Sequence, residues 1–218
     1  MSKTVFFDID GTIWDDDMVI AACGNYIEMD GKVIYENDLS ADMVQKVIRV
    51  LSECKMPVVL EGSTDYWIDD EGFEDDPYVD YLFESLGEHA HIIRGYDGEI
   101  KINKFSADVI DGTDYERVKA EFADDFLILE HVENVVEFVP KGTSKATGIK
   151  WLCKHLGIPL DETYAIGDSV NDLEMLESVG HGIAMGNSMP PVKEIAEYVT
   201  SDISDDGVKN ALKHYGLI

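Results

Sequence analysis

Two short clusters of carboxylates are the residues in this sequence that could do chemistry. Asp8 and Asp10 follow the apolar run TVFF. Asp168 and Asp172 follow the apolar run YAI and a glycine. An apolar run that ends in a turn is typical of a buried strand in a parallel sheet, whose ligands bind beyond the carboxyl ends of the strands. The pattern therefore indicates a ligand site, although a turn or a helix cap explains either cluster alone.

The two clusters together indicate a bound cation. If the two strands are neighbours, the carboxylates converge, and like charges at short range are costly unless something neutralises them. A hard divalent cation does so, and oxygen ligands with several waters suit Mg²⁺. The same cation would help an acidic protein hold an anionic, phosphorylated substrate.

Lys145 is a third residue with possible chemical significance. It opens a predicted helix in the segment KGTSKATG, where its positive charge opposes the helix dipole. Pairing with a carboxylate or with phosphate oxygens would explain the position. The alternative is an ordinary exposed lysine, and Lys141 is close enough in the chain to take the same role.

Net charge limits the partners of the chain. Its 218 residues include 45 acidic and 17 basic side chains, which give a formal net charge of −28. Such a surface repels phosphate backbones, so we expect no nucleic acid partner. Cys23, Cys54 and Cys153 lack metal or disulfide spacing and predict reduced core thiols in a cytoplasmic protein. No stretch approaches the length of a membrane span, and nothing in the sequence indicates the oligomeric state.

The pattern of elements changes at Pro140. From there to the C-terminus short apolar strands alternate with helices, which is typical of a parallel sheet covered on both faces. We therefore expect an α/β core formed by residues 1–24 and 140–218, with an α+β insert at residues 25–139. The predicted hairpin at residues 25–35 could belong to the hinge between core and insert.

Apolar runs, helix caps and turn residues predict the helices and strands near and within the insert. Residues 19–23 form an apolar run that predicts a buried strand. Helices are expected to begin after Ser40, at Pro77 and at Thr113. Residues 91–106 are expected to form strands around a turn at Asp97.

Taken in chain order, these motifs match a known family. The segment DIDGT, then a lysine at a helix start, then GDSVND resembles the haloacid dehalogenase superfamily of phosphohydrolases. The large insert is similar to the cap of the Cof-type branch, as are the closing segments GHGIAMGNSMPPVKEIAEYVT and DDGV. The resemblance covers nearly the whole chain. It implies a Rossmann-like parallel-sheet core with an inserted α+β cap.

The resemblance also implies a reaction, the Mg²⁺-dependent hydrolysis of phosphate monoesters of small metabolites, with sugar phosphates as the expected substrates. Asp8 would attack phosphorus to form an aspartyl-phosphate, which divides the displacement into two steps. Asp10 would protonate the leaving alcohol and then activate water. Lys145 would offset the charge of the phosphoryl group.

Further residues are assigned to binding by the same resemblance. The expected metal ligands are Asp8, the backbone carbonyl of Asp10, Asp168 and the supporting Asp172. The expected phosphate-binding residues are Gly11, Thr12, Lys145 and Asn171.

One motif of the family is missing from the sequence. The family has a strand ending in Ser or Thr that binds phosphate, and Ser63 and Thr64 lie inside the insert instead. The connection between the first two predicted strands is also too short. Parallel strands need a crossover of about a dozen residues or more, usually a helix. Only nine residues separate Ile9 from Val19. We therefore expect one strand–helix unit to be absent near residues 17–20, through a natural deletion or an internally shortened sequence.

Other functions remain open at this point. A sugar phosphomutase would use the same residues, and a catalytically impaired binding or regulatory protein would explain the missing motif. A response-regulator-like receiver also places acids and a lysine around Mg²⁺, but the large insert and the DxD spacing argue against it. In the insert, Arg94 and Lys104 could contact substrate, although a surface charge is the simpler interpretation of each.

Overall fold

The described residues of this computed structural model are 4–7, 18–68, 77–96, 98–131 and 134–218. They form two compact units. The first combines Met1–Glu36 with Thr143–Ile218, and the second is Asn37–Gly142. The hairpin that the sequence left between core and insert therefore belongs to the first unit.

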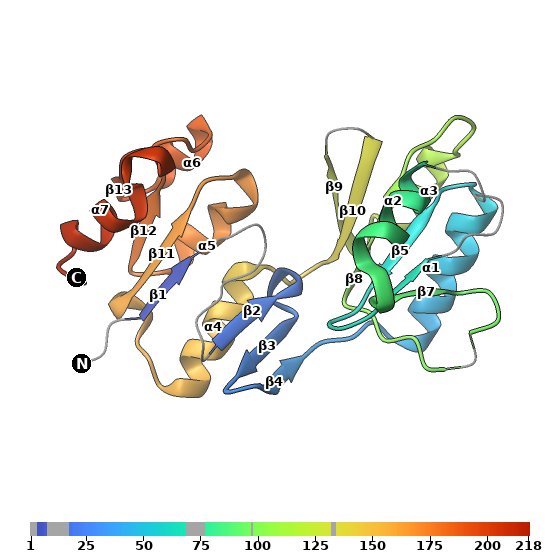
Figure 1. The fold of residues 1–218 in the computed structure, drawn as a ribbon, viewed down its shortest axis with the longest axis horizontal. Helices are drawn as coiled ribbons and strands as arrows, with labels where there is room; N and C mark the ends of the chain where they lie inside the picture. Colours follow the sequence, from blue (N-terminus) through green and yellow to red (C-terminus); the bar gives the residue numbers. More distant parts are fainter. Residues whose placement is uncertain (1–3, 8–17, 69–76, 97, 132–133) are drawn as a thin grey trace. The chain divides into compact units, whose positions relative to one another are not determined.

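A parallel sheet forms the centre of the first unit (Figure 1). Its strand order is β1-β11-β12-β13, and all neighbouring pairs are parallel. The strands are β1 (Thr4–Phe7), β11 (Thr163–Gly167), β12 (His181–Ala184) and β13 (Tyr198–Val199). The strands that precede the two carboxylate clusters are thus neighbours, with Phe7 opposite Ile166, which is the condition under which the sequence predicts that the carboxylates converge.

Helices cover both faces of this sheet. They are α4 (Lys145–Leu156), α5 (Leu173–Ser178), α6 (Pro190–Ile195) and α7 (Gly207–His214). On one face Phe6 and Ala165 pack with apolar side chains of α4, α5 and α6. On the other face Tyr164 and Ile166 pack with Ala211 of α7. Every residue of β11 is buried, which explains its continuous apolar sequence and confirms the α/β class.

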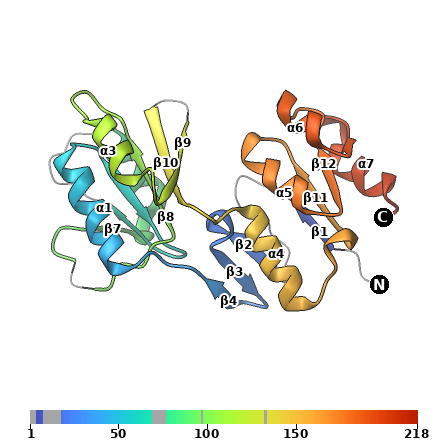
Figure 2. The ribbon, with the colours of Figure 1, turned by 180° about the vertical axis from the view of Figure 1, so that it is seen from behind.

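A small antiparallel sheet belongs to the same unit. It contains β2 (Met18–Ala21), β3 (Tyr26–Met29) and β4 (Lys32–Glu36). Figure 2 shows α4 beside these strands. The predicted hairpin is confirmed, and Asp30 and Gly31 at its turn both have positive φ. The strand expected at residues 19–23 is shorter, because the backbone turns left-handed at Ala22 and remains so to Gly24.

The second unit is built on a six-stranded sheet of order β7-β6-β5-β8-β10-β9. Its strands are β5 (Val58–Glu61), β6 (Tyr66–Ile68), β7 (Ala90–Ile92), β8 (Lys104–Asp108), β9 (Phe126–Glu130) and β10 (Val135–Pro140). Its helices are α1 (Ala41–Glu53), α2 (Pro77–Leu86) and α3 (Tyr115–Phe122). Apolar residues of α1 and α3 pack with Phe105 and Phe138 on one face, whereas residues of α2 pack with Val59 and Ile68.

Most helix starts agree with the local signals. The Ser40 side chain accepts a hydrogen bond from the Met43 N–H and caps α1 as expected. The cap of α3 is Asp114 rather than Thr113, because the Asp114 carboxylate accepts from the Arg117 N–H. Within the described part of residues 91–106, strands form only in β7 and at the start of β8. Asp97, at the expected turn, lies outside the described residues.

Candidate active site at the carboxyl edge of the parallel sheet

Lys145 stands at the first position of α4, as predicted. The helix begins there because Ser144 and Thr147 form a reciprocal cap, in which the Thr147 N–H donates to Ser144 Oγ and the Ser144 N–H donates to Thr147 Oγ1 at 2.9 Å. The helix ends before Gly157, whose left-handed backbone terminates it. The cap formed by Ser144 and Thr147 adjoins Lys145 and fixes the backbone from which its side chain leaves.

The Lys145 ammonium pairs with Asp172. Lys145 Nζ donates to Asp172 Oδ1 at 2.7 Å. The Lys145 side chain is 17% exposed, and that of Asp172 is 0% exposed. Asp172 Oδ2 accepts two backbone N–H groups, from Asp168 at 3.0 Å and from Ser169 at 3.1 Å. One buried carboxylate thus joins the start of α4 to the turn that follows β11.

Gly167 allows this close arrangement. A Cβ atom at Gly167 would lie 2.7 Å from the Cβ, Cγ and Oδ2 atoms of Asp172. That separation is shorter than any ordinary carbon contact, so a larger residue would displace the buried carboxylate. The glycine of the GDSVND motif is therefore required by packing at the end of β11.

Asp168 differs from Asp172 in its exposure. It follows the last residue of β11, and its side chain is exposed. Asn187 Nδ2 donates to Asp168 Oδ2 at 3.3 Å, and Ser188 Oγ donates to the Gly167 carbonyl at 3.2 Å. Loop residues after β12 therefore support the turn and leave the Asp168 carboxylate accessible.

Some of the predicted site residues can be located and others cannot. Lys145, Asp168 and Asp172 meet at the carboxyl edge of β11, next to β1. Asn171 is exposed, and its Oδ1 accepts a hydrogen bond from Ser169 Oγ. Four predicted residues lie outside the described residues: Asp8, Asp10, Gly11 and Thr12. Asp8 follows Phe7, the last residue of β1, directly in the chain.

The donor set of this edge fits a hard cation in part. Asp168 offers an exposed carboxylate, which is the oxygen ligand that Mg²⁺ prefers. Asp172 is different, because both of its oxygens already accept hydrogen bonds from Lys145 and from backbone amides. Within the described residues no group of three His, Cys, Asp or Glu side chains forms a metal-binding cluster. Two of the expected ligands, Asp8 and Asp10, lie outside the described residues.

Two groups of contacts were not expected from the sequence. Asn187 and Ser188 follow β12, and their place after a parallel strand is the signal that could have identified them. Asn25, in the first unit, is fully buried and donates to Thr143 Oγ1, two residues before Lys145. Nothing in the sequence near Asn25 indicates this long-range contact.

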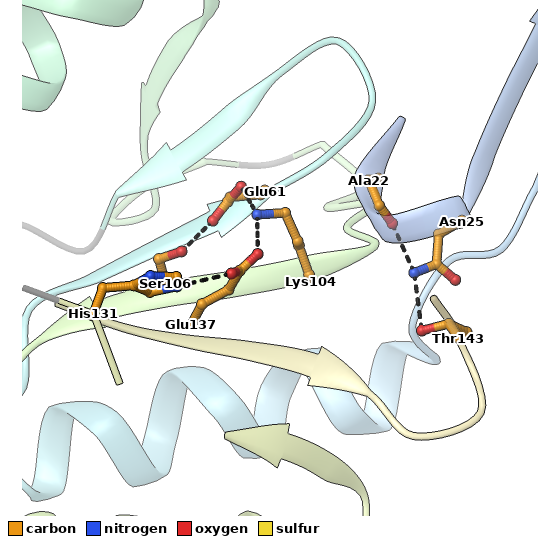
Figure 3. Close-up of polar contacts among 8 residues, drawn as sticks. All are labelled: Ala22, Asn25, Glu61, Lys104, Ser106, His131, Glu137 and Thr143. Carbon is orange, nitrogen blue, oxygen red and sulfur yellow. Dashed lines mark hydrogen bonds and ion pairs between the residues drawn. The ribbon is translucent and has the colours of Figure 1, made fainter. Parts of the chain in front are cut away.

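Lys104 was expected to be a surface charge, and this expectation is wrong. Its side chain is 18% exposed and lies between two carboxylates on neighbouring strands (Figure 3). Lys104 Nζ is 2.7 Å from Glu61 Oε2 and 2.7 Å from Glu137 Oε1. Ser106 Oγ donates to Glu61, and His131 Nε2 is 3.0 Å from Glu137 Oε2.

Burial and charge act in opposite directions on this cluster. Burial alone would lower the pKa of Lys104, but the two carboxylates raise the pKa above its ordinary value. Burial would raise the pKa of Glu137, but the Lys104 ammonium holds this pKa below its ordinary value. Arg94, the other expected contact of the insert, is exposed. Both residues belong to the second unit.

The cysteines and the lengths of the helices bear on two further expectations. None of the three cysteines forms a disulfide, and burial raises the pKa of the Cys54 and Cys153 thiols, which makes these two inert core residues. None of the helices in the described ranges combines the length and the apolar character needed to cross a membrane.

Comparisons with known proteins agree with this geometry. The family described as haloacid dehalogenase-like hydrolase matches residues 14–212. "Putative phosphatase YkrA" of Bacillus subtilis (strain 168) is 28% identical, over 100% of this chain and 99% of the relative. A hypothetical protein from Geobacillus kaustophilus HTA426 has a similar structure, with a TM-score of 0.84, 25% identity and 99% of each chain covered. The HAD subclass IIB sugar phosphatase BT4131 shares the fold, with a TM-score of 0.76, 22% identity and full coverage of both chains.

The alignment with YkrA also bears on the missing strand–helix unit. It extends over 272 positions, whereas this chain has 218 residues, so the relative contains internal segments without a counterpart here. In the described sheet, β1 lies at the edge and pairs with β11 alone. The strand order, the lysine at the start of α4, the GDSVND turn and the family match lead to one assignment: the chain belongs to the haloacid dehalogenase-like hydrolase family.

Proposed function

We propose that this hydrolase removes phosphate from monoesters of small metabolites, with Mg²⁺ as cofactor and with Asp8 as nucleophile. The observation that carries the proposal is the meeting of Lys145, Asp172 and Asp168 at the carboxyl edge of β11, beside β1. Phosphatase activity is supported by the family match and by the name of the relative YkrA. A sugar phosphate as substrate is supported by the structural neighbour BT4131, which is a sugar phosphatase.

The residues of this edge have distinct parts in the proposed reaction. Asp8 attacks phosphorus, and the bond between phosphorus and the alcohol oxygen breaks as the aspartyl-phosphate forms. Asp10 gives its proton to the departing alkoxide and then takes a proton from the water that hydrolyses the intermediate. The Lys145 ammonium, held by Asp172, attracts the phosphoryl oxygens and is positioned before the substrate binds.

The cation would be held by the Asp8 carboxylate, the Asp10 carbonyl and Asp168. When bound, it neutralises charge on the phosphoryl group and on the converging carboxylates. Asp172 has its oxygens engaged by Lys145 and by two amides. We therefore propose that Asp172 supports the site by orienting Lys145 and the turn at residues 168–169, rather than by direct ligation.

A second candidate is a catalytically impaired member that still binds phosphorylated ligands. It is favoured by the position of β1 at the edge of the described sheet and by the internal segments that YkrA has in addition. Without the strand that would follow, the site lacks the Ser or Thr hydroxyl that its family uses to hold phosphate. The two candidates share the metal site and differ in turnover.

Metal binding is tested with Asp168→Asn, and Asp161→Asn, which changes another exposed carboxylate, serves as the matched control. Titration calorimetry with MgCl₂ should give at least tenfold weaker binding for Asp168→Asn and an unchanged affinity for Asp161→Asn. Phosphate release from a panel of phosphorylated metabolites then identifies the substrate class. Unchanged Mg²⁺ affinity in Asp168→Asn would rule out this ligand, and Mg²⁺ binding without phosphate release would favour the impaired member.

A further inference from the structure

A strained turn lies beside the start of α4. Ala22, Cys23 and Gly24 have φ angles of 50°, 53° and 83°. Two of these residues carry a side chain, and such residues rarely adopt a left-handed backbone unless the surrounding structure imposes it. The turn directly follows β2 and precedes β3, so it is anchored by strands on both sides.

Hydrogen bonds from Asn25 stabilise this turn. Its side chain is 0% exposed, which is unusual for an amide. Asn25 Nδ2 donates to the Ala22 carbonyl at 2.9 Å, and the Asn25 backbone N–H donates to the same oxygen at 3.0 Å. The buried side-chain amide and the backbone N–H of Asn25 therefore both hold the Ala22 carbonyl across the turn.

The same amide reaches the segment that leads into α4. Asn25 Nδ2 also donates to Thr143 Oγ1 at 3.3 Å, and Figure 3 shows the amide between Ala22 and Thr143. Thr143 immediately precedes Ser144, the residue that caps α4, and Lys145 follows. One buried side chain thus connects residues that are 118 positions apart in the sequence.

Backbone packing reinforces this connection. A Cβ atom at Gly24 would lie 2.2 Å from the Ser144 carbonyl oxygen and 3.0 Å from the Gly148 nitrogen. A Cβ atom at Gly148 would in turn lie 2.9 Å from the Gly24 Cα. The turn and the first turn of α4 are therefore in direct backbone contact, and a shift of one displaces the other.

We infer that Asn25 is a positioning residue for Lys145: its amide holds the turn at residues 22–25 against Thr143 and thereby sets the start of α4. The inference rests on the proposed function of Lys145. The side-chain hydrogen bonds of Asn25 to Ala22 and Thr143 are the contacts that carry this role. Asn25 acts through Thr143 and Ser144 on the direction in which the ammonium meets Asp172 and the phosphoryl group, and small misplacements of such groups reduce rates strongly.

The inference is tested with Asn25→Leu and Thr143→Val, which remove the donor and the acceptor of one hydrogen bond at similar side-chain volume. Each should lower kcat about tenfold with less than a twofold change in KM, and the double variant should lose no more than the more severe single variant. Thr143→Ser keeps the hydroxyl and should restore kcat. A purely structural role would lower the melting temperature and leave kcat unchanged in the folded protein.

A second readout does not depend on turnover. In protein labelled with ¹³C at lysine Cε, the Lys145 resonance, assigned through Lys145→Met, should move in both Asn25→Leu and Thr143→Val. The resonance of Lys150, which is exposed on the same helix, should stay in place. An unmoved Lys145 resonance in folded Thr143→Val would overturn the inference. Absence of turnover in the wild type with a moved resonance would overturn the proposed function and leave the positioning role supported.

Discussion

Separating Lys145 from Asp172 should cost both stability and activity. In Lys145→Met a fully buried carboxylate loses its cation, whereas in Asp172→Asn an amide N–H group faces the ammonium. Loss of one partner of a buried pair costs about 3–5 kcal/mol. We expect the lower end, about 3 kcal/mol, because two backbone N–H groups still compensate Asp172 and Lys145 retains some exposure to water.

The double variant Lys145→Met/Asp172→Asn distinguishes a real pair from two independent defects. It leaves no unpaired charge, so its destabilisation should be about 2 kcal/mol smaller than the sum of the single losses. Urea unfolding followed by circular dichroism gives the four free energies of the cycle. Lys150→Met, on the exposed face of the same helix, should change stability by no more than about 0.5 kcal/mol.

Activity provides the second half of the same test. Each single variant should lose about 10²–10³-fold in kcat, since the ammonium acts on charge that develops in the transition state. Lys150→Met should keep its turnover. Free energies that add within about 0.5 kcal/mol, or wild-type turnover in Lys145→Met, would refute the reasoning.

Three further changes have defined outcomes. Lys104→Met should lose about 3 kcal/mol in urea unfolding at pH 7, because it removes the ammonium that lies between two partly buried glutamates. The folded state lowers the pKa of Glu137 from 4.5, so the stabilisation that this carboxylate contributes is present above pH 4.5 and is lost as the pH falls through the lowered pKa. The difference in unfolding free energy between wild type and Lys104→Met should therefore narrow as the pH falls below 4.5. Gly167→Ala should lose about 2 kcal/mol and reduce activity, because its methyl group would collide with Asp172. Ser144→Ala should lose about 1 kcal/mol in thermal unfolding through the missing helix cap.

Much of the first unit could be predicted from local sequence. The apolar run before GDSVND and the residues around Ser144 contain the information for a buried strand and a capped helix. These features depend on residues close together in the chain, and periodicity and capping report on such residues directly. The sequence left open whether β1 and β11 are neighbours, and the structure pairs them in parallel.

What escaped prediction depends on contacts between distant residues. The sequence did not indicate which carboxylate Lys145 contacts, and in the structure the oxygens of Asp172 accept hydrogen bonds from Lys145 and from two backbone amides. The supporting place of Asp172 at a metal stays a prediction. Lys104 was expected at the surface, and its two glutamate partners come from strands far away in sequence. The left-handed turn at Ala22 arises from packing against α4, which no local signal reveals.

Phosphate release from p-nitrophenyl phosphate, measured with and without Mg²⁺ for the wild type and Asp8→Asn, tests the central claim most directly. The account predicts turnover by the wild type that is abolished by EDTA and restored by added Mg²⁺. Asp8→Asn should bind Mg²⁺ more weakly, because it loses a ligand carboxylate, and should show no turnover even at saturating Mg²⁺, because an amide cannot form the aspartyl-phosphate. Absence of Mg²⁺-dependent turnover in folded wild type, or normal turnover in Asp8→Asn, would contradict the account.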